Sequence, residues 1–122
     1  YDKNLVNNSK NVDVLFHEAM SLDLLNIINK NAERVDNTMA AKVTIDIQDY
    51  HTPILEVVKA AKEANVGHLV FYHHLPAPRS QLMQNIMYRG VDKIMENWTA
   101  SHDGTMVILP TDSDEIIITS VD

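Results

Sequence analysis

The sequence HTPILEVVKAAKEANVGHLVFYHH spans residues 51–74 and decides the fold class. Thr52 is suited to cap a helix, and Pro53 suits the first helical position, where a missing N–H costs nothing. Apolar residues then recur at helical spacing up to about residue 64, and 65–67 (Asn-Val-Gly) end the helix. The compact apolar run 69–72 predicts a buried strand directly afterwards. A helix leading into a buried strand predicts an α/β fold.

Upstream of this stretch, the β-branched and apolar run 12–16 predicts another buried strand, which ends at His17. Ser21 is a plausible cap for a helix that begins at Leu22. Asn37 could cap a further short helical stretch, but 42–47 alternates apolar and polar residues and predicts a strand. The predicted order is therefore strand, helix, strand, helix.

Downstream, the proline-bearing segment 73–79 predicts a loop that cannot continue the sheet. Residues spaced by three or four positions then predict a long amphipathic helix: Met83, Met87, Val91, Ile94 and Trp98. The runs 106–109 and 115–119 predict two closing strands that form a hairpin. No internal repeat or change of composition divides the chain, so we expect residues 1–122 to form a single domain.

Composition limits the classes of function. The chain has 122 residues, 45% of them hydrophobic, and a net charge of −7, which disfavours binding to nucleic acid through many phosphate contacts. It contains no cysteine, so His, Asp and Glu are the available metal ligands. No apolar run approaches the length of a membrane span, and we expect no membrane partner. Because disulfides are impossible, the sequence leaves the cytoplasm and the periplasm equally open.

Three histidine-bearing segments carry the chemistry of this sequence. His17 follows the first predicted strand and precedes Glu18, His51 stands at a helix start, and His73 and His74 follow a buried strand. Histidines at such junctions suit metal binding or acid/base chemistry better than isolated surface imidazoles do. The three segments together predict one rim of a functional site.

The same segments resemble a known family. The run 13–20 (DVLFHEAM), the pair His51-Thr52 at a helix start, and the run 69–73 (LVFYH) are similar to the C-terminal half of metallo-β-lactamase-fold hydrolases. The nearest branch is the ribonuclease Z and arylsulfatase-like group. The resemblance covers about residues 1–80. It implies half of an αββα sandwich, with a mixed sheet and flanking helices, from an enzyme that holds two zinc ions.

The resemblance implies a role for several residues. His73 matches a metal ligand. Adjacent residues of an extended chain point in opposite directions, so only one of His73 and His74 should bind the metal, and the position directly after the predicted strand favours His73. His51 matches a histidine that protonates the leaving group, held by a glutamate that matches Glu18. From the residues alone, His51 is equally well explained as an exposed ring beside a helix cap. His17 and His74 are predicted to support the site or contact substrate, although a buried structural role also fits His17.

The family's upstream ligands, including a His-x-His-x-Asp-His motif, do not occur in this sequence. We therefore expect a C-terminal fragment of a longer hydrolase that cleaves a small ester of phosphate or sulfate, or a lactone. The two zinc ions belong to the complete enzyme, and the fragment alone need not bind either of them. An unpaired half sandwich would expose an apolar sheet face, so we expect a homodimer or association with the missing half. The alternatives are a non-catalytic α/β binding or assembly module and a tRNA 3′-processing endonuclease, which the acidic composition disfavours.

Overall fold

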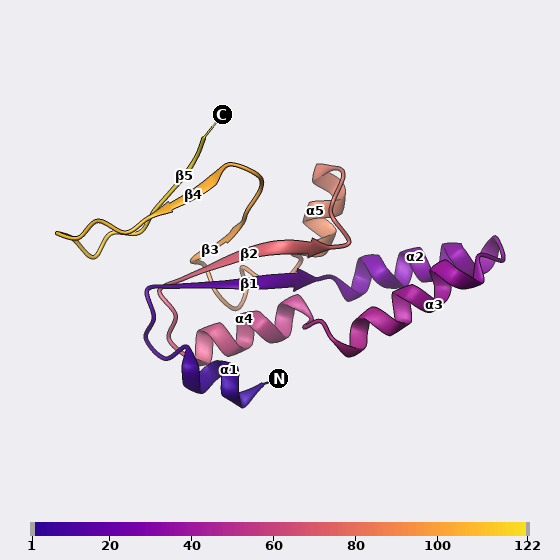
Figure 1. Cartoon of the computed structure of the whole chain (residues 1–122), viewed down its shortest axis with the longest axis horizontal. Coiled ribbons are helices and arrows are strands. Elements are labelled where there is room, and N and C mark those ends of the chain that lie inside the picture. Colours follow the sequence, from indigo (N-terminus) through magenta and orange to yellow (C-terminus); the bar gives the residue numbers. More distant parts are fainter. Residues whose placement is uncertain (1, 122) are drawn as a thin grey trace.

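The computed structural model describes residues 2–121 and is built from helices and two small sheets (Figure 1). In chain order the elements are α1 (Lys3–Asn8), β1 (Val14–Met20), α2 (Leu22–Arg34), α3 (Thr38–Asp46), a 3-10 turn (Ile47–Asp49), α4 (Ile54–Glu63), β2 (His68–Leu75), α5 (Gln81–Met87), β3 (Trp98–Ala100), β4 (Thr105–Ile108) and β5 (Ile117–Ser120). The α/β class predicted from the sequence is confirmed at this level.

The larger sheet contains three parallel strands in the order β1-β2-β3. Strands β1 and β2 are joined through α2, α3 and α4, as parallel neighbours require a long crossover connection. Since both strands run in the same direction, their carboxyl ends meet at one edge of the sheet. This edge is where the sequence places the histidines.

The hairpin predicted near the end of the chain is confirmed. Strands β4 and β5 pair antiparallel, with Thr105 opposite Ser120 and Ile108 opposite Ile117. They form a separate two-stranded sheet that lies apart from the three-stranded sheet (Figure 1). The single mixed sheet expected from the sequence is therefore replaced, in residues 2–121, by one parallel and one antiparallel sheet.

The main core lies between the parallel sheet and α4, which runs below the strands beside α1 in Figure 1. On α4, Val57 and Val58 are completely buried, and they share this core with Leu69 and Phe71 of β2. Burying such side chains contributes roughly 1.5–3 kcal/mol each. The well-packed α4 and β2 thus hold the edge of the sheet in place.

The strand predicted for residues 42–47 is wrong. Residues 38–46 form α3, which begins at the cap provided by Asn37, as the competing interpretation required. The helix packs antiparallel to α2, where the side-chain amide of Asn29 donates to the Ala41 carbonyl and to the Thr44 hydroxyl, both at 2.9 Å. Buried Thr44 points into this contact, so packing against α2 overrides the alternating pattern.

The long helix predicted from Met83 to Trp98 is also wrong. Helix α5 ends at Met87, and Gly90 turns the chain with a φ of +92°. Val91 is buried although it lies beyond the helix, and Trp98 instead begins β3, opposite Leu69 of β2. The apolar residues after Met87 are spaced as in a helix because an irregular segment places them in the core at similar intervals.

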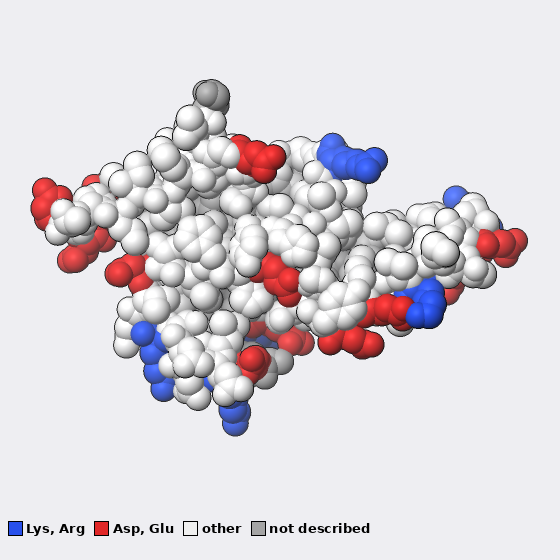
Figure 2. Space-filling view, in the orientation of Figure 1, with Lys and Arg blue, Asp and Glu red and all other residues white. Residues whose placement is uncertain are grey.

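The surface shown in Figure 2 carries scattered acidic groups and a few basic groups, most of them toward its margins. Its middle, over β1 and β2, is mostly uncharged. Within residues 2–121, no helix combines the length and apolar character needed to cross a bilayer.

Candidate functional site

Glu18 and His73 lie where β1 and β2 end side by side. The two strands pair regularly up to Glu18 and Tyr72, and pairing resumes with Ala19 opposite His74. His73 therefore has no partner on β1 and is an extra, bulged residue with a φ of +45°. The strand was predicted to end at Tyr72 but continues to Leu75, and the irregularity within it places His73 in the left-handed region.

His51 reaches the same edge from the segment before α4. Pro53 forms a bridge with Met20 at the end of β1, so the segment runs alongside that strand. The Nδ1 atom of His51 lies 2.5 Å from Glu18 Oε2, and the Thr52 backbone N–H donates to Glu18 Oε1 at 3.1 Å. The predicted cap at Thr52 and the predicted first helical position of Pro53 are both wrong, because Pro53 occupies the N-cap position, without a side-chain cap hydrogen bond, and α4 begins at Ile54.

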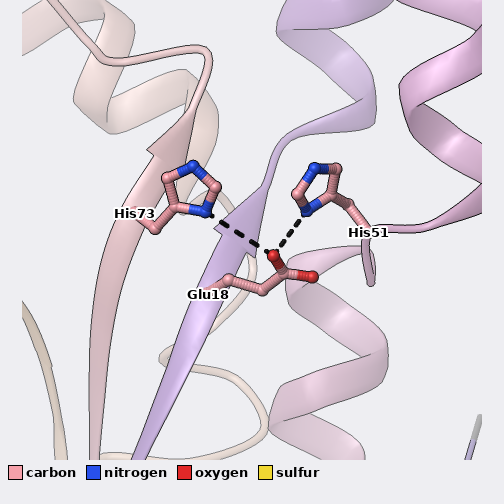
Figure 3. Close-up of side chains that lie close together, drawn as sticks. All are labelled: Glu18, His51 and His73. Carbon is pink, nitrogen blue, oxygen red and sulfur yellow. Dashed lines mark hydrogen bonds and ion pairs between the residues drawn. The ribbon is translucent and has the colours of Figure 1, made fainter.

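The three side chains form a compact cluster in which the Glu18 carboxylate lies between two imidazoles (Figure 3). His73 Nδ1 lies 3.7 Å from Glu18 Oε2, and the ring centroids of His51 and His73 are 5.5 Å apart. The remaining ring nitrogens of both histidines point away from the carboxylate. The His73 side chain is 54% exposed, whereas those of His51 and Glu18 are 15% and 21% exposed. The site is thus supported from within and open on the His73 side.

Opposing effects set the pKa of Glu18. Burial raises the pKa of this carboxyl. Hydrogen bonds from His51 and from the Thr52 N–H lower the pKa and together with the smaller effect of the His51 and His17 charges outweigh the effect of burial. The net result is a pKa below the ordinary value. Glu18 is therefore a carboxylate at neutral pH and is ready to pair with a cation or a protonated imidazole.

The donor set fits a divalent metal ion. One ligand atom from each of Glu18, His51 and His73 lies within 4.8 Å of the others. Two imidazole nitrogens and a carboxylate oxygen are ligands that Zn²⁺ accepts, at distances of about 2.0–2.2 Å. The cluster therefore offers up to three ligand atoms to one ion.

The two remaining predicted site residues lie outside the cluster. The His17 ring bonds back to the Glu18 carbonyl through Nδ1 at 3.0 Å and lines a cavity of about 320 Å³ beside α1 and α4. The His74 ring contacts the Tyr88 hydroxyl and the Ser101 carbonyl instead. His73 therefore lies in the cluster and His74 does not, and a bulge rather than the alternation of a regular strand produces this arrangement.

Sequence reasoning missed three groups around the site. The backbone N–H of Thr52 binds Glu18, while Tyr88 and Ser101 hold His74. Tyr88 and Ser101 follow His74 by 14 and 27 residues, and no local pattern marks either of them. Only the three-dimensional path of the chain between α5 and β3 brings them to β2.

No protein-family model, curated protein or solved structure matches the chain. The arrangement of the cluster is therefore the basis on which a function can be proposed.

Proposed function

We propose that this chain carries one wall of the active site of a metal-dependent hydrolase that cleaves a small ester of phosphate or sulfate, or a lactone. One observation carries the proposal: an ionised Glu18 lies between two imidazoles whose remaining nitrogens point away from it. This arrangement provides both a metal ligand and a proton donor at the same edge of the sheet.

His73 is the residue best placed to bind the metal. Its ring is the most exposed of the three, and it projects from the carboxyl end of β2 beside the carboxylate. A bound divalent ion would supply an activated water and stabilise negative charge on the attacked centre. In the resembled hydrolases two ions share further ligands, and we propose that these come from a missing N-terminal half or from a partner in trans.

His51 and Glu18 would act as an acid/base pair. Because the carboxylate faces Nδ1 of His51, it fixes the orientation of the ring and holds the proton on Nδ1. The opposite nitrogen is then free to donate a proton to the leaving-group oxygen. This role requires that His51 does not bind the metal. Loss of His51 should therefore affect hydrolysis, whereas loss of His73 should affect zinc binding.

A binding or assembly module is the second candidate, and exposed apolar side chains favour it. On α3, Met39 is 78% exposed and Val43 is 50% exposed, and Tyr50 farther along is 65% exposed. Such side chains are common at surfaces that contact another protein. In this alternative the cluster would stabilise the fold without chemistry.

Zinc titration by calorimetry tests the metal site, with His73→Ala and His51→Asn compared with wild type. We expect His73→Ala to weaken zinc binding by at least about 100-fold, because loss of a ligand should cost no less than loss of a group that supports one. We expect His51→Asn to change zinc binding by less than about tenfold. His102→Ala is the matched control, because His102 is exposed and lies outside the cluster. Wild type binding zinc no better than His73→Ala would contradict the proposal.

Hydrolysis tests the acid/base pair separately. With zinc present, and with the N-terminal half supplied where the natural chain includes one, we expect His51→Asn to lower hydrolysis of an aryl phosphodiester or aryl sulfate by about 10²–10⁴-fold. The effect should fall on kcat with little change in zinc affinity. Full activity of His51→Asn would exclude the proton-donor role.

A further inference from the structure

We propose that His74 and Tyr88 are positioning residues that hold the bulge at the end of β2 and thereby direct His73 into the site. The inference rests on the proposed metal-binding role of His73. It gives a role to His74, whose two ring nitrogens both have hydrogen-bond partners although His74 lies outside the cluster.

The bulge is what aims the His73 ring. In a regular strand, side chains alternate between faces, so the residue after Tyr72 would point away from the face that carries Tyr72. His73 instead has a φ of +45° and no partner on β1, and its ring lies beside Glu18. Such a conformation is unfavourable for a residue with a side chain and persists where its surroundings enforce it.

His74 is the residue that fixes the chain immediately after the bulge. It resumes the pairing of β2 by lying opposite Ala19, and both nitrogens of its ring have partners. Its Nε2–H donates to the Ser101 carbonyl at 2.7 Å, since that carbonyl can only accept. Its Nδ1 therefore accepts from the Tyr88 hydroxyl, at 2.6 Å. The two bonds tie the end of β2 to segments that follow α5 and β3.

Tyr88 is itself held rigidly by the core. It is 5% exposed, and its ring packs against Phe71 and Trp98 with centroids 5.4 and 4.9 Å apart. Burial raises the pKa of its hydroxyl above the ordinary value, so the hydroxyl keeps its proton and remains a donor. The anchor of His74 is therefore an ordered part of the main core.

These contacts oppose a slip of β2. Without them, the chain could relax by one residue so that His73 paired with Ala19, and each later residue would then turn to the opposite face. His74 would lose both of its partners, and His73 would leave Glu18. The hydroxyl of Tyr88 thus affects the metal site through His74, without contacting the metal.

Tyr88→Phe tests this inference, because it removes only the hydroxyl and keeps the packed ring. We expect zinc affinity to fall by about tenfold, as supporting residues of metal ligands typically show. His74→Gln keeps an amide near the position of Nε2 and loses the bond to Tyr88, so it should show the same loss. Folding of both variants is checked by thermal unfolding.

Thr99→Val is the matched control. The Thr99 hydroxyl lies 2.9 Å from Nε2 of His68, so this variant also removes a hydroxyl bonded to a β2 histidine, at the opposite end of the strand. We expect it to lower stability without changing zinc affinity. Equal losses of affinity in Thr99→Val and Tyr88→Phe would overturn the positioning role and indicate a general loss of stability.

Nuclear magnetic resonance separates failure of this inference from failure of the proposed function. In metal-free protein we expect the backbone shifts of His73 to report a positive φ and the ring nitrogens of His74 to report the Nε2–H form, and both signals should change in Tyr88→Phe. If wild type binds no zinc but these changes occur, the proposed function fails while the positioning role stands. Unchanged signals and unchanged zinc affinity in Tyr88→Phe would overturn the positioning role.

Discussion

The two ends of β2 use histidine in contrasting ways. At its start the strand is regular, and His68 lies opposite Val14 with its ring bonded to Thr99 of β3. At its end the strand bulges, so His73 leaves the pairing and joins Glu18, while His74 takes over the structural role. The comparison shows that one extra residue in a strand brings the His73 ring beside Glu18, while the next side chain, His74, stays bonded to neighbouring segments.

Phe71 links both ends, so its removal should produce the largest effect on stability. It is completely buried and contacts Tyr88 and Trp98. We expect Phe71→Ala to lower the free energy of unfolding by about 3–5 kcal/mol, measured with denaturant. Phe16→Ala is the control on the neighbouring strand, where the side chain is 53% exposed, and should cost less than about 1 kcal/mol. Similar losses in both variants would show that Phe71 does not link the two ends.

Glu18→Gln tests the bulged end alone. The carboxylate binds His51 and the Thr52 N–H, and an amide would keep the shape while losing the charge. For metal-free protein at pH 7 we expect a loss of about 1–2 kcal/mol, because hydrogen bonds to charged groups are stronger than neutral ones. Exposed Glu33, replaced in the same way, should change stability by less than about 0.5 kcal/mol. No loss in Glu18→Gln would mean that the carboxylate contributes nothing to holding residues 51–53.

His68→Gln tests the regular end and should have the smallest effect. Burial lowers the pKa of His68, so its neutral form is favoured in the folded protein. The folded state is therefore fully stabilised above the ordinary histidine pKa and loses stability as pH falls from about 6.5 through the lowered value. Because the ring is partly exposed, we expect the loss to stay below about 1 kcal/mol.

The measurement for His68 is the free energy of unfolding of metal-free protein between pH 7.5 and 5, compared with His68→Gln. The variant should show a shallower fall in stability with acid than wild type. His102→Gln provides the control, since His102 is exposed. Identical slopes for wild type and His68→Gln would assign the acid sensitivity to other groups.

Local sequence signals predicted the elements around the site well. Helix α4 and strand β2 carry clear apolar patterns, and the closing hairpin was recognisable from its two short runs. The predictions failed where tertiary packing decides the outcome. Thr44 is buried against Asn29 of α2, and the turn at Gly90 redirects a chain whose apolar spacing resembles a helix. Neither effect can be read from the neighbouring residues.

The site was predictable in part for the same reason. The positions of Glu18, His51 and His73 at strand and helix ends placed them near one another, but their distances depend on the register of β1 with β2. The sequence gives only a weak signal for the bulge, because His73 is not glycine, the residue most tolerant of a positive φ, although histidine adopts such a φ more often than most residues. Its supports, Tyr88 and Ser101, are distant in sequence.

The two oxygens of Glu18 have separate tasks. Oε1 holds the backbone of Thr52, whereas Oε2 faces both imidazoles. A proton or a cation can therefore come and go at Oε2 while Oε1 keeps the loop before α4 tethered to β1. Oε1 keeps the Thr52 backbone attached while the partner of Oε2 changes, so the charge at the site can change without releasing the segment before α4.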